Sequence, residues 1–557
     1  MISESTSLDP RINGTRARLY DSGHSRLRRW MERLSYCVLL ISVSPTICAA
    51  LPEDYPRTHS TAFRDYSSTS VGKFFEEAAV QHPGESGFVI IRHGRRAFTA
   101  RVALTELAEK SLDVQYYIWE ADATGRILAD RLVRAADRGV RVRVLVDDIN
   151  LSGRDETVAS IDAHPNIEIR VFNPFANRGW RALDFLIDLN RINHRMHNKL
   201  MVMDNAVAIV GGRNIGDHYF GVATDANFRD LDIAAAGPVV RDISKAFDHF
   251  WEGDWAVPIS ALVERLHTEA DLKVFLEAPR KRTAEEDYPY PLDQDVDDLK
   301  SELASIRDQL IWAPGRIVWD DPADIRKGIR QGAMIQGFYR QMETLKRELL
   351  IESAYFVTQD RAIEDMKKLT ERGVRVRVLT NSLASNDVVA AHAGHAKRRK
   401  QLIANGMELY ELRPDAGAIK RQVFSGDSKA SLHTKAAVFD REAVFIGSFN
   451  LDPRSANINT EAGLYIESPE LAQQVIACMN EGVEPENSYR VRLDTDEDLI
   501  WITEIDGKEV RYDNEPETSF WQRFMSRCIE MLPVEHQMRA KMSSPVRFSG
   551  AITRSTP

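Results

Sequence analysis

Two series of apolar runs follow one another along this chain in the same order. Apolar, strand-like runs occupy residues 112–119, 138–145 and 167–172 in the first half and residues 349–357, 372–379 and 407–412 in the second. In each half, an amphipathic stretch with helical spacing precedes the middle run. The pattern therefore predicts the order strand, helix, strand, strand in both halves.

The middle run of each half is the same eight-residue string. Arg-Gly-Val-Arg-Val-Arg-Val-Leu occurs at 138–145 and again at 372–379, which indicates an internal duplication. Strands that alternate with helices of roughly ten to fifteen residues indicate parallel strands joined by right-handed crossovers. We therefore predict an α/β protein with two duplicated α/β sandwich domains. The arginines of the string could grip phosphate, but their alternation along a strand favours solvated ends or internal ion pairs.

Changes in amino-acid composition divide the whole chain into segments. The predicted segments are a leader (1–50), a linker (51–84), a first domain (85–279), a charged, Pro-containing linker or insertion (280–330), a second domain (331–485), a C-terminal hairpin and amphipathic helix (486–535) and a tail (536–557). Asp506-Gly507 marks the turn of the hairpin. The apolar stripe of the helix, with Phe520, Trp521 and Phe524, suits docking on the catalytic core or contact with a membrane, and we favour docking.

The N-terminus has three interpretations. Residues 1–30 are rich in Arg and Ser, Met31 is an alternative start, and the apolar stretch 36–43 before Cys48 forms a weak signal-peptide pattern. A cleaved export signal, an uncleaved anchor and a misassigned start all stay open, and lipidation of Cys48 is the least favoured option. No later run reaches the ~20 apolar residues that a membrane-spanning helix needs. We therefore expect peripheral or N-terminally anchored contact with a bacterial cell membrane.

Composition narrows the function further. The chain has 557 residues and a formal net charge of −10, which argues against extensive binding to nucleic acid. Its four cysteines have neither a disulfide framework nor zinc spacing. We predict no metal and no cofactor.

A second repeated motif contains polar residues that could carry out chemistry. It consists of His197, Lys199, Asp204, Gly211, Gly212 and Asn214 in the first half and of His433, Lys435, Asp440, Gly447, Ser448 and Asn450 in the second. The internal spacing is the same in both halves, and the separation of the two histidines differs from that of the two arginine strings by two residues. The motif therefore belongs to the duplicated unit.

These residue types suit a phosphodiester. Histidine and lysine two positions apart on a strand project to the same face and so into one site. Two ammonium groups and two side-chain amides can stabilise the negative charge that develops on the phosphoryl oxygens. They belong to Lys199, Lys435, Asn214 and Asn450.

The two histidines divide the chemistry between them. One of His197 and His433 attacks phosphorus to give a phosphohistidine, and the other protonates the leaving oxygen and then activates the acceptor hydroxyl. Small residues let the backbone approach the substrate closely. The predicted substrate-binding residues are Gly211, Gly212, Gly447 and Ser448.

Each histidine needs a carboxylate on its other ring nitrogen to fix its tautomer and orientation. Asp230 and Glu461 each stand eight residues before a proline at a predicted strand end, and we assign them this role. Asp232 competes with Asp230 in the first half. Asp204 and Asp440 precede turns, where holding the fold is favoured over chemistry.

The chain resembles the phospholipase D superfamily and, within it, the bacterial cardiolipin synthases of the C group. The resemblance covers roughly residues 85–535. It rests on the repeated motif and on five strings: Leu-Asp-Val-Gln-Tyr-Tyr-Ile-Trp at 112–119, Phe-Asn-Pro-Phe at 172–175, Gly-Gly-Arg-Asn-Ile-Gly-Asp at 211–217, Thr-Asn-Ser-Leu-Ala-Ser-Asn-Asp-Val at 380–388 and Ile-Gly-Ser-Phe-Asn-Leu-Asp-Pro-Arg-Ser at 446–455. It implies two phospholipase D-like sandwich domains packed pseudo-symmetrically around one active site.

The resemblance also implies an activity. A phosphatidyl group would pass, without a metal, through His197 as nucleophile onto a glycerol hydroxyl of phosphatidylglycerol, with His433 as acid and then base. The donor would be phosphatidylglycerol or phosphatidylethanolamine, and a partner protein stays open. The alternatives are a hydrolase that releases phosphatidic acid, a nuclease, which the acidic charge disfavours, and an inactive lipid-binding scaffold, which should have lost a motif residue.

Overall fold

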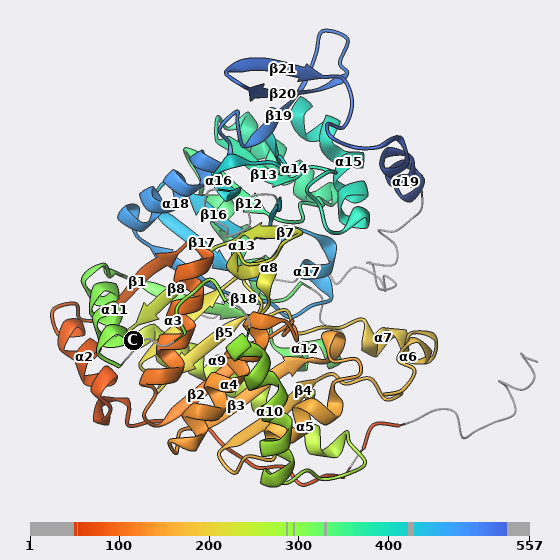
Figure 1. Cartoon of the computed structure of the whole chain (residues 1–557). Coiled ribbons are helices and arrows are strands. Elements are labelled where there is room, and N and C mark those ends of the chain that lie inside the picture. The colour runs from red at the N-terminus through yellow and green to blue at the C-terminus, as the bar shows by residue number, and fades with distance from the viewer. Residues whose placement is uncertain are drawn as a thin grey trace, which may run out of the picture.

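The computed structural model describes residues 50–52, 54–285, 288–292, 296–327, 331–420 and 428–531. The predicted leader, with Met31 and Cys48, lies outside the described residues except for Ala50, and so does the predicted tail 536–557. Figure 1 shows two α/β halves stacked on one another, with the first half below and the second above.

The first half is built on a nine-stranded sheet in the described part of the chain, with the order β10-β1-β8-β6-β5-β2-β3-β4-β9. Its strands are β1 (Ser86–Ile91), β2 (Ser111–Tyr116), β3 (Arg141–Asp147), β4 (Ile167–Phe172), β5 (Leu200–Met203), β6 (Val207–Gly211), β8 (Asp232–Ala236), β9 (Ala256–Pro258) and β10 (Ile311–Ala313).

The second half has a sheet of ten described strands in the order β11-β18-β17-β16-β12-β13-β14-β19-β20-β21. They are β11 (Gly315–Trp319), β12 (Glu348–Ser353), β13 (Arg375–Asn381), β14 (Glu408–Leu412), β16 (Lys435–Phe439), β17 (Ala443–Gly447), β18 (Ala462–Glu467), β19 (Ser488–Leu493), β20 (Leu499–Ile505) and β21 (Lys508–Tyr512).

The duplication is visible in the centre of both sheets. Strands β2, β3 and β4 are parallel, as are β12, β13 and β14. The motif strand of each half then joins antiparallel to the first strand of this trio, β5 to β2 and β16 to β12. The predicted α/β fold with two duplicated domains is confirmed, and each sheet is mixed because the motif strands run against the parallel trio.

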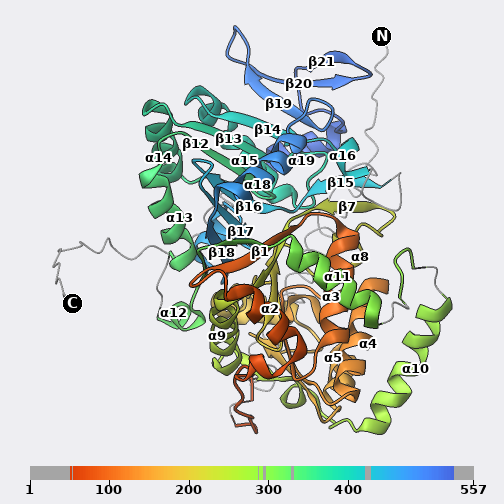
Figure 2. The same cartoon turned by 90° about the vertical axis from the view of Figure 1, so that its left-hand side faces the viewer.

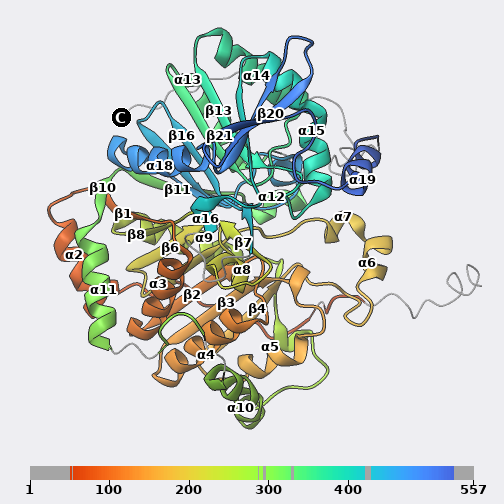
Figure 3. The same cartoon turned by 45° about the horizontal axis from the view of Figure 1, so that its top comes forward.

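Helices cover both faces of each sheet (Figures 2 and 3). Those of the first half are α2 (Ser70–Ala79), α3 (Gly94–Leu107), α4 (Ala123–Asp137), α5 (Asp155–Asp162), α6 (Ala182–Ile187), α7 (Leu189–Ile192), α8 (Asp217–Phe220), α9 (Pro238–Glu252), α10 (Glu269–Glu285) and α11 (Val296–Asp308). Those of the second half are α12 (Pro322–Arg326), α13 (Ala333–Thr344), α14 (Asp360–Glu371), α15 (Val389–Ala404), α16 (Gly417–Lys420), α17 (Pro453–Asn457), α18 (Pro469–Gly482) and α19 (Phe520–Met531). Among the described residues there are also three single 3₁₀ turns, η1 (Tyr66–Ser68), η2 (Asp148–Asn150) and η3 (Ile259–Ala261).

The two halves share a hydrophobic core. Phe247 and Phe250 of α9 belong to the same buried cluster as Val438 and Leu464 of the second sheet and Val475 of α18. Burial of such side chains is the main favourable contribution to folding. The two halves are therefore packed directly against each other.

The stretch 280–330, which the sequence predicted to be a linker or insertion, is largely structured. It contains the end of α10, the helix α11 and the strands β10 and β11. Strand β10 extends the edge of the first sheet by pairing with β1, and β11 extends the edge of the second by pairing with β18. The chain therefore crosses from one sheet to the other at Pro314. Apolar runs this short, between charged segments, give little pattern to detect.

The C-terminal region confirms the predicted hairpin. Asp506 and Gly507 have positive φ angles of 51° and 73°, and Ile505 pairs with Lys508, which is the geometry of a two-residue type I′ turn. The helix α19 packs against α15, but Phe520 and Trp521 are 66% and 69% exposed. The prediction that the apolar stripe of this helix docks on the core is therefore wrong for these residues, because α15 covers the other side of the helix.

Candidate functional site

Short parallel pairings between the halves position both histidines. Strands β7 (Ala226–Arg229) and β15 (Lys429–Leu432) form a small parallel sheet, and His433 follows it directly. At the equivalent place beside the other histidine, His197, the residues Met196 and Thr460 form a single parallel β-bridge. The backbone N–H of His433 donates to the carbonyl of Arg229 at 2.8 Å, and that of His197 donates to the carbonyl of Thr460 at 2.9 Å.

Each histidine meets a carboxylate of the other half. His197 Nδ1 lies 2.8 Å from Glu461 Oε2, and His433 Nδ1 lies 2.6 Å from Asp230 Oδ2. All four residues are buried. The predicted pairs of motif and acid therefore exist, but they are crossed between the two halves, a choice that the sequence left open.

Asp232, the competing acid, contacts arginines in place of histidine. Its carboxylate pairs with Arg101 at 2.9 Å and with Arg213 at 3.3 Å, and these side chains are all buried. Arg213 also donates to the carbonyl of Asp230 at 2.6 Å. Asp232 therefore holds the guanidinium that supports the Asp230 backbone.

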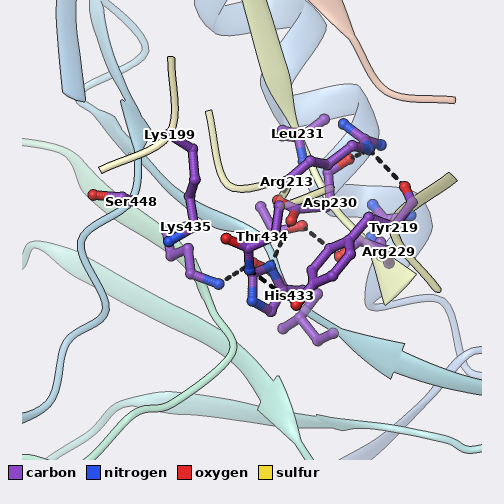
Figure 4. A network of polar contacts seen from close by, with 12 residues as sticks. Lys199, Arg213, Tyr219, Arg229, Asp230, Leu231, His433, Thr434, Lys435 and Ser448 are labelled. Atoms are coloured by element: carbon purple, nitrogen blue, oxygen red, sulfur yellow. Dashed lines mark hydrogen bonds and ion pairs between the residues drawn. The ribbon is translucent and has the colours of Figure 1, made fainter. Parts of the chain in front are cut away.

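The two lysines approach the site from opposite halves. Figure 4 shows the side chains of Lys199 and Lys435 next to each other beside His433. Lys199 Nζ donates to the carbonyl of His197 at 2.5 Å, and Lys435 Nζ donates to that of His433. The motif thus brings two ammonium groups and two imidazoles to one place, where a single phosphate could contact them.

Burial shifts the protonation equilibria of this cluster. Burial and the two neighbouring lysines hold the pKa of His197 and of His433 well below the ordinary value. Burial also lowers the pKa of Lys199, and it lowers that of Lys435 to about 8. The free site therefore favours neutral imidazoles, which leaves the Nε2 of a histidine available as a nucleophile when Nδ1–H donates to a carboxylate.

The acids respond in the opposite direction. Burial raises the pKa of Glu461 to about 7 and that of Asp230 above its usual range, although the lysines counteract this shift. The Ser448 hydroxyl also donates to Glu461 Oε2 at 2.5 Å, and its backbone carbonyl lies 3.1 Å from His197 Nδ1. Ser448 therefore contacts both members of the His197 pair.

The two asparagines of the motif differ in their contacts. Asn214 accepts from the Ile118 N–H at 3.2 Å and donates to the Tyr219 hydroxyl at 2.9 Å. Asn450 is buried, and its Oδ1 has no hydrogen-bond partner among the described residues. Buried polar groups are normally satisfied, so the Asn450 oxygen is available to accept a hydrogen bond from a substrate hydroxyl.

The glycines make room for the acids. A Cβ at Gly212 would lie 2.2 Å from Asp230 Oδ1, and one at Gly211 would lie 2.2 Å from Asp232 Oδ1. At Gly447 a Cβ would lie 2.5 Å from the Ala462 carbonyl. These positions need close approach of neighbouring chain segments, and their predicted contact with substrate stays a prediction.

Aromatic side chains that the sequence did not single out enclose the histidines. The Tyr117 ring lies 4.8 Å from that of His197, and the Tyr219 and Phe228 rings lie 5.1 Å and 5.2 Å from that of His433. Tyr117 follows the end of β2, where the apolar run 112–119 continues beyond the strand. The length of this apolar run was the sequence feature that could have indicated an aromatic residue beyond the strand, near the site. These rings cover part of the surface of each imidazole.

The motif aspartates hold turns. Asp204 has a φ of 52° and accepts hydrogen bonds from the N–H groups of Glu109, Lys110 and Ser111. Asp440 has a φ of 54° and binds three consecutive N–H groups, at residues 346–348, in the same way. The fold-holding role predicted for both is confirmed.

The arginine strings form internal ion pairs. Arg143 pairs with Asp113 and with Asp248, each at 2.7 Å, and Arg375 pairs with Glu408 at 2.8 Å. The favoured interpretation of these strings as a source of internal ion pairs is confirmed.

Comparisons with known proteins agree with this geometry. Residues 102–251 and 339–481 match the family described as cardiolipin synthase, PLD-like domain. The chain is 40% identical to cardiolipin synthase C of Escherichia coli (strain K12) over 459 residues, which cover 82% of this chain and 97% of that protein. It is 26% identical to cardiolipin synthase A of Pseudomonas putida (strain GB-1), with 71% and 68% of the two chains covered.

Among solved structures, phosphatidylserine synthase of Haemophilus influenzae Rd KW20 has a similar fold. The alignment has a TM-score of 0.53 and 16% sequence identity, and it covers 83% of this chain and 98% of that one. At this identity the likeness concerns the fold alone, and it extends over both halves.

Proposed function

This chain belongs to the cardiolipin synthase family with phospholipase D-like domains, and from that membership we propose that it moves a phosphatidyl group onto a glycerol hydroxyl of phosphatidylglycerol. The observation that carries the proposal is the pair of crossed histidine–carboxylate contacts beside two buried lysines. Two histidines with opposite duties are what a two-step transfer through a covalent intermediate requires.

In the first step, His197 Nε2 attacks the phosphorus of the donor lipid. The bond from phosphorus to the headgroup oxygen breaks, and protonated His433 gives its proton to that oxygen. Lys199 and Lys435 stabilise the charge on the remaining phosphoryl oxygens, together with the side-chain NH₂ group of Asn450 as a donor. The donor anion between the two ammonium groups raises the pKa of His433, so that binding itself favours the protonated acid.

In the second step, the direction of proton transfer reverses. The hydroxyl of phosphatidylglycerol loses its proton to neutral His433, its oxygen attacks phosphorus, and the bond from phosphorus to His197 Nε2 breaks. Cardiolipin leaves and the free histidine is restored. Glu461 and Asp230 hold the imidazole of the opposite half in the tautomer with a free Nε2, and so act as positioning residues.

The substrates are phospholipids, which reside in membranes. No helix in the described ranges is long and apolar enough to cross a bilayer. We propose that the described part of the protein contacts the bacterial cell membrane peripherally, with phosphatidylglycerol as acceptor and either phosphatidylglycerol or phosphatidylethanolamine as donor.

Product analysis tests this function. Purified protein is incubated with labelled phosphatidylglycerol in mixed micelles, with and without phosphatidylethanolamine, and the lipids are separated. Labelled cardiolipin is the expected product, and a yield that depends on phosphatidylethanolamine would identify the donor. Phosphatidic acid as the sole product would make the protein a hydrolase with the same residues, and no lipid product would contradict the proposal.

The rate should fall in alkaline solution. Burial lowers the pKa of Lys435 to about 8. Lysine is charged below its pKa, so the Lys435 side chain is a fully charged ammonium well below pH 8 and loses its charge as the pH rises above 8. We expect kcat/KM to drop by up to about tenfold per pH unit above pH 8.

The measurement is a profile of kcat/KM between about pH 5.5 and 9.5. Lys435→Arg is the control, because a guanidinium keeps its charge throughout this range. Its profile should lose the alkaline decline even if its rate is lower. An unchanged decline in this variant would assign the titration to another group.

A further inference from the structure

Exposed apolar side chains gather on three segments of the chain. Of the large hydrophobic side chains that are exposed in the described ranges, most lie in the α6–α7 region, at the start of α15 or on α19. They are Trp180, Phe185, Leu186, Ile187, Leu189, Val388, Val389, Phe520, Trp521, Phe524 and Met525. We call this set the apolar face. Leu266 and Val274, near and on α10, are exposed elsewhere.

The three segments project from one side of the molecule. Figures 1 and 3 both show α6, α7 and α19 on the right, with α15 beside α19. The first two segments follow the carboxyl ends of parallel strands, α6–α7 after β4 and α15 after β13. In α/β proteins, ligands bind at that end of the strands.

Two of the three segments are also close in the chain to residues of the site. Helix α7 ends at Ile192, five residues before His197. Asp387 directly precedes Val388 and Val389 and is exposed. Its carboxylate accepts a hydrogen bond from the Tyr355 hydroxyl at 2.9 Å. Its charge also acts on Lys435 of the site.

Contacts of Glu515, five residues before α19, attach the start of this helix to α15. Glu515, just before the helix, pairs with Arg399 of α15 at 2.5 Å and with His392 at 3.2 Å. Arg399 pairs in turn with Glu411 at 2.7 Å. A charged cluster with this burial orients the elements that carry it. The exposure of the apolar side of α19 therefore results from a defined attachment.

We propose that the apolar face is the surface by which this protein docks on an anionic phospholipid bilayer, with the catalytic site directed at the lipids. The proposal rests on the proposed function, because a transferase whose two substrates are both lipids must collect them at such a surface. Trp and Phe side chains beside arginine are typical of helices that lie in a membrane interface. Arg527 of α19 is exposed and can contact lipid phosphate.

Vesicle sedimentation tests the proposal with matched variants. The full chain is mixed with vesicles of phosphatidylcholine and phosphatidylglycerol, and the bound fraction is measured for wild type, Phe520→Ser/Trp521→Ser/Phe524→Ser and Leu186→Ser/Ile187→Ser. Leu266→Ser/Val274→Ser is the control, because these residues are 72% and 70% exposed but lie outside the apolar face. We expect binding to weaken at least about tenfold in the first two variants and to stay unchanged in the third.

A further measurement separates loss of membrane docking from loss of catalysis. Transfer with a short-chain phosphatidylglycerol below its micelle concentration should stay near the wild-type rate in every variant, because none of these residues contacts the site. If wild type fails to transfer even this substrate, the proposed function fails, while vesicle binding still tests the face.

Other outcomes would overturn the proposal. Equal vesicle binding by all variants would do so, and so would equal loss in the control variant. A change from dimer to monomer in the α19 variant, with vesicle binding intact, would make the face an interface between copies of this chain.

Discussion

His197→Ala is expected to abolish cardiolipin formation, with a rate loss of at least about 10⁴-fold, and His433→Ala should cause a loss of similar size. The first variant lacks the atom that bonds to phosphorus, and the second lacks the group that protonates the leaving oxygen. Both histidines are buried and hydrogen-bonded to acids, so thermal unfolding of each variant is the control that separates loss of chemistry from loss of fold. Residual activity above a few per cent in either variant would contradict the two-histidine scheme.

An activated substrate separates the two roles. A phosphatidyl ester of nitrophenol has a leaving group that needs no proton, so His433→Ala should still release nitrophenol in a single burst and retain the phosphatidyl group on His197. His197→Ala should give no burst. Intact-protein mass spectrometry would detect the adduct. Its appearance in His197→Ala and absence in His433→Ala would exchange the two assignments.

The acids should follow the histidine that they contact, across the halves. Glu461→Gln is expected to behave like a weakened His197, and Asp230→Asn like a weakened His433, each with about 10²- to 10⁴-fold loss of transfer. An amide in place of the carboxylate removes the negative charge and can hold the wrong tautomer of the imidazole. Burst release of nitrophenol should therefore survive in Asp230→Asn and slow strongly in Glu461→Gln.

Asp232→Asn is the matched control in the first half. Asp232 pairs with Arg101 and Arg213 and touches neither histidine, so its loss should lower the melting temperature more than the rate of the chemical step. If Asp230→Asn slows the burst while Glu461→Gln leaves it unchanged, the carboxylates serve the histidines of their own halves and the crossed scheme is wrong.

The sequence predicted much of this arrangement because the chain carries it twice. Equal spacings identified the motif, and the repeated strings located the parallel strands in both halves. The position of Asp230 and Glu461 before a proline indicated which acids to consider. The sequence could not predict which acid contacts which histidine, because the same spacing is compatible with pairing within a half or between the halves. The answer depends on contacts such as that between Met196 and Thr460.

Other features escaped because their signals are tertiary. Strand β10 has three residues, and it exists because the edge of β1 is available to pair with it. The apolar side of α19 has the pattern of a helix that docks on a core, and the sequence does not indicate which side α15 covers. Periodicity reports that a helix has two faces, and only the fold decides what each face meets.

The crossed pairs also bear on the synthesis of the chain. His197 and Glu461 are separated by 264 positions, so a ribosome has made most of the protein before the acid of the first histidine exists. Until the second half has been made, Asp230 has no His433 and His197 has no Glu461 to contact. A partial chain therefore lacks an oriented imidazole, and reactivity towards phospholipids begins only when both halves have been translated and have closed on each other.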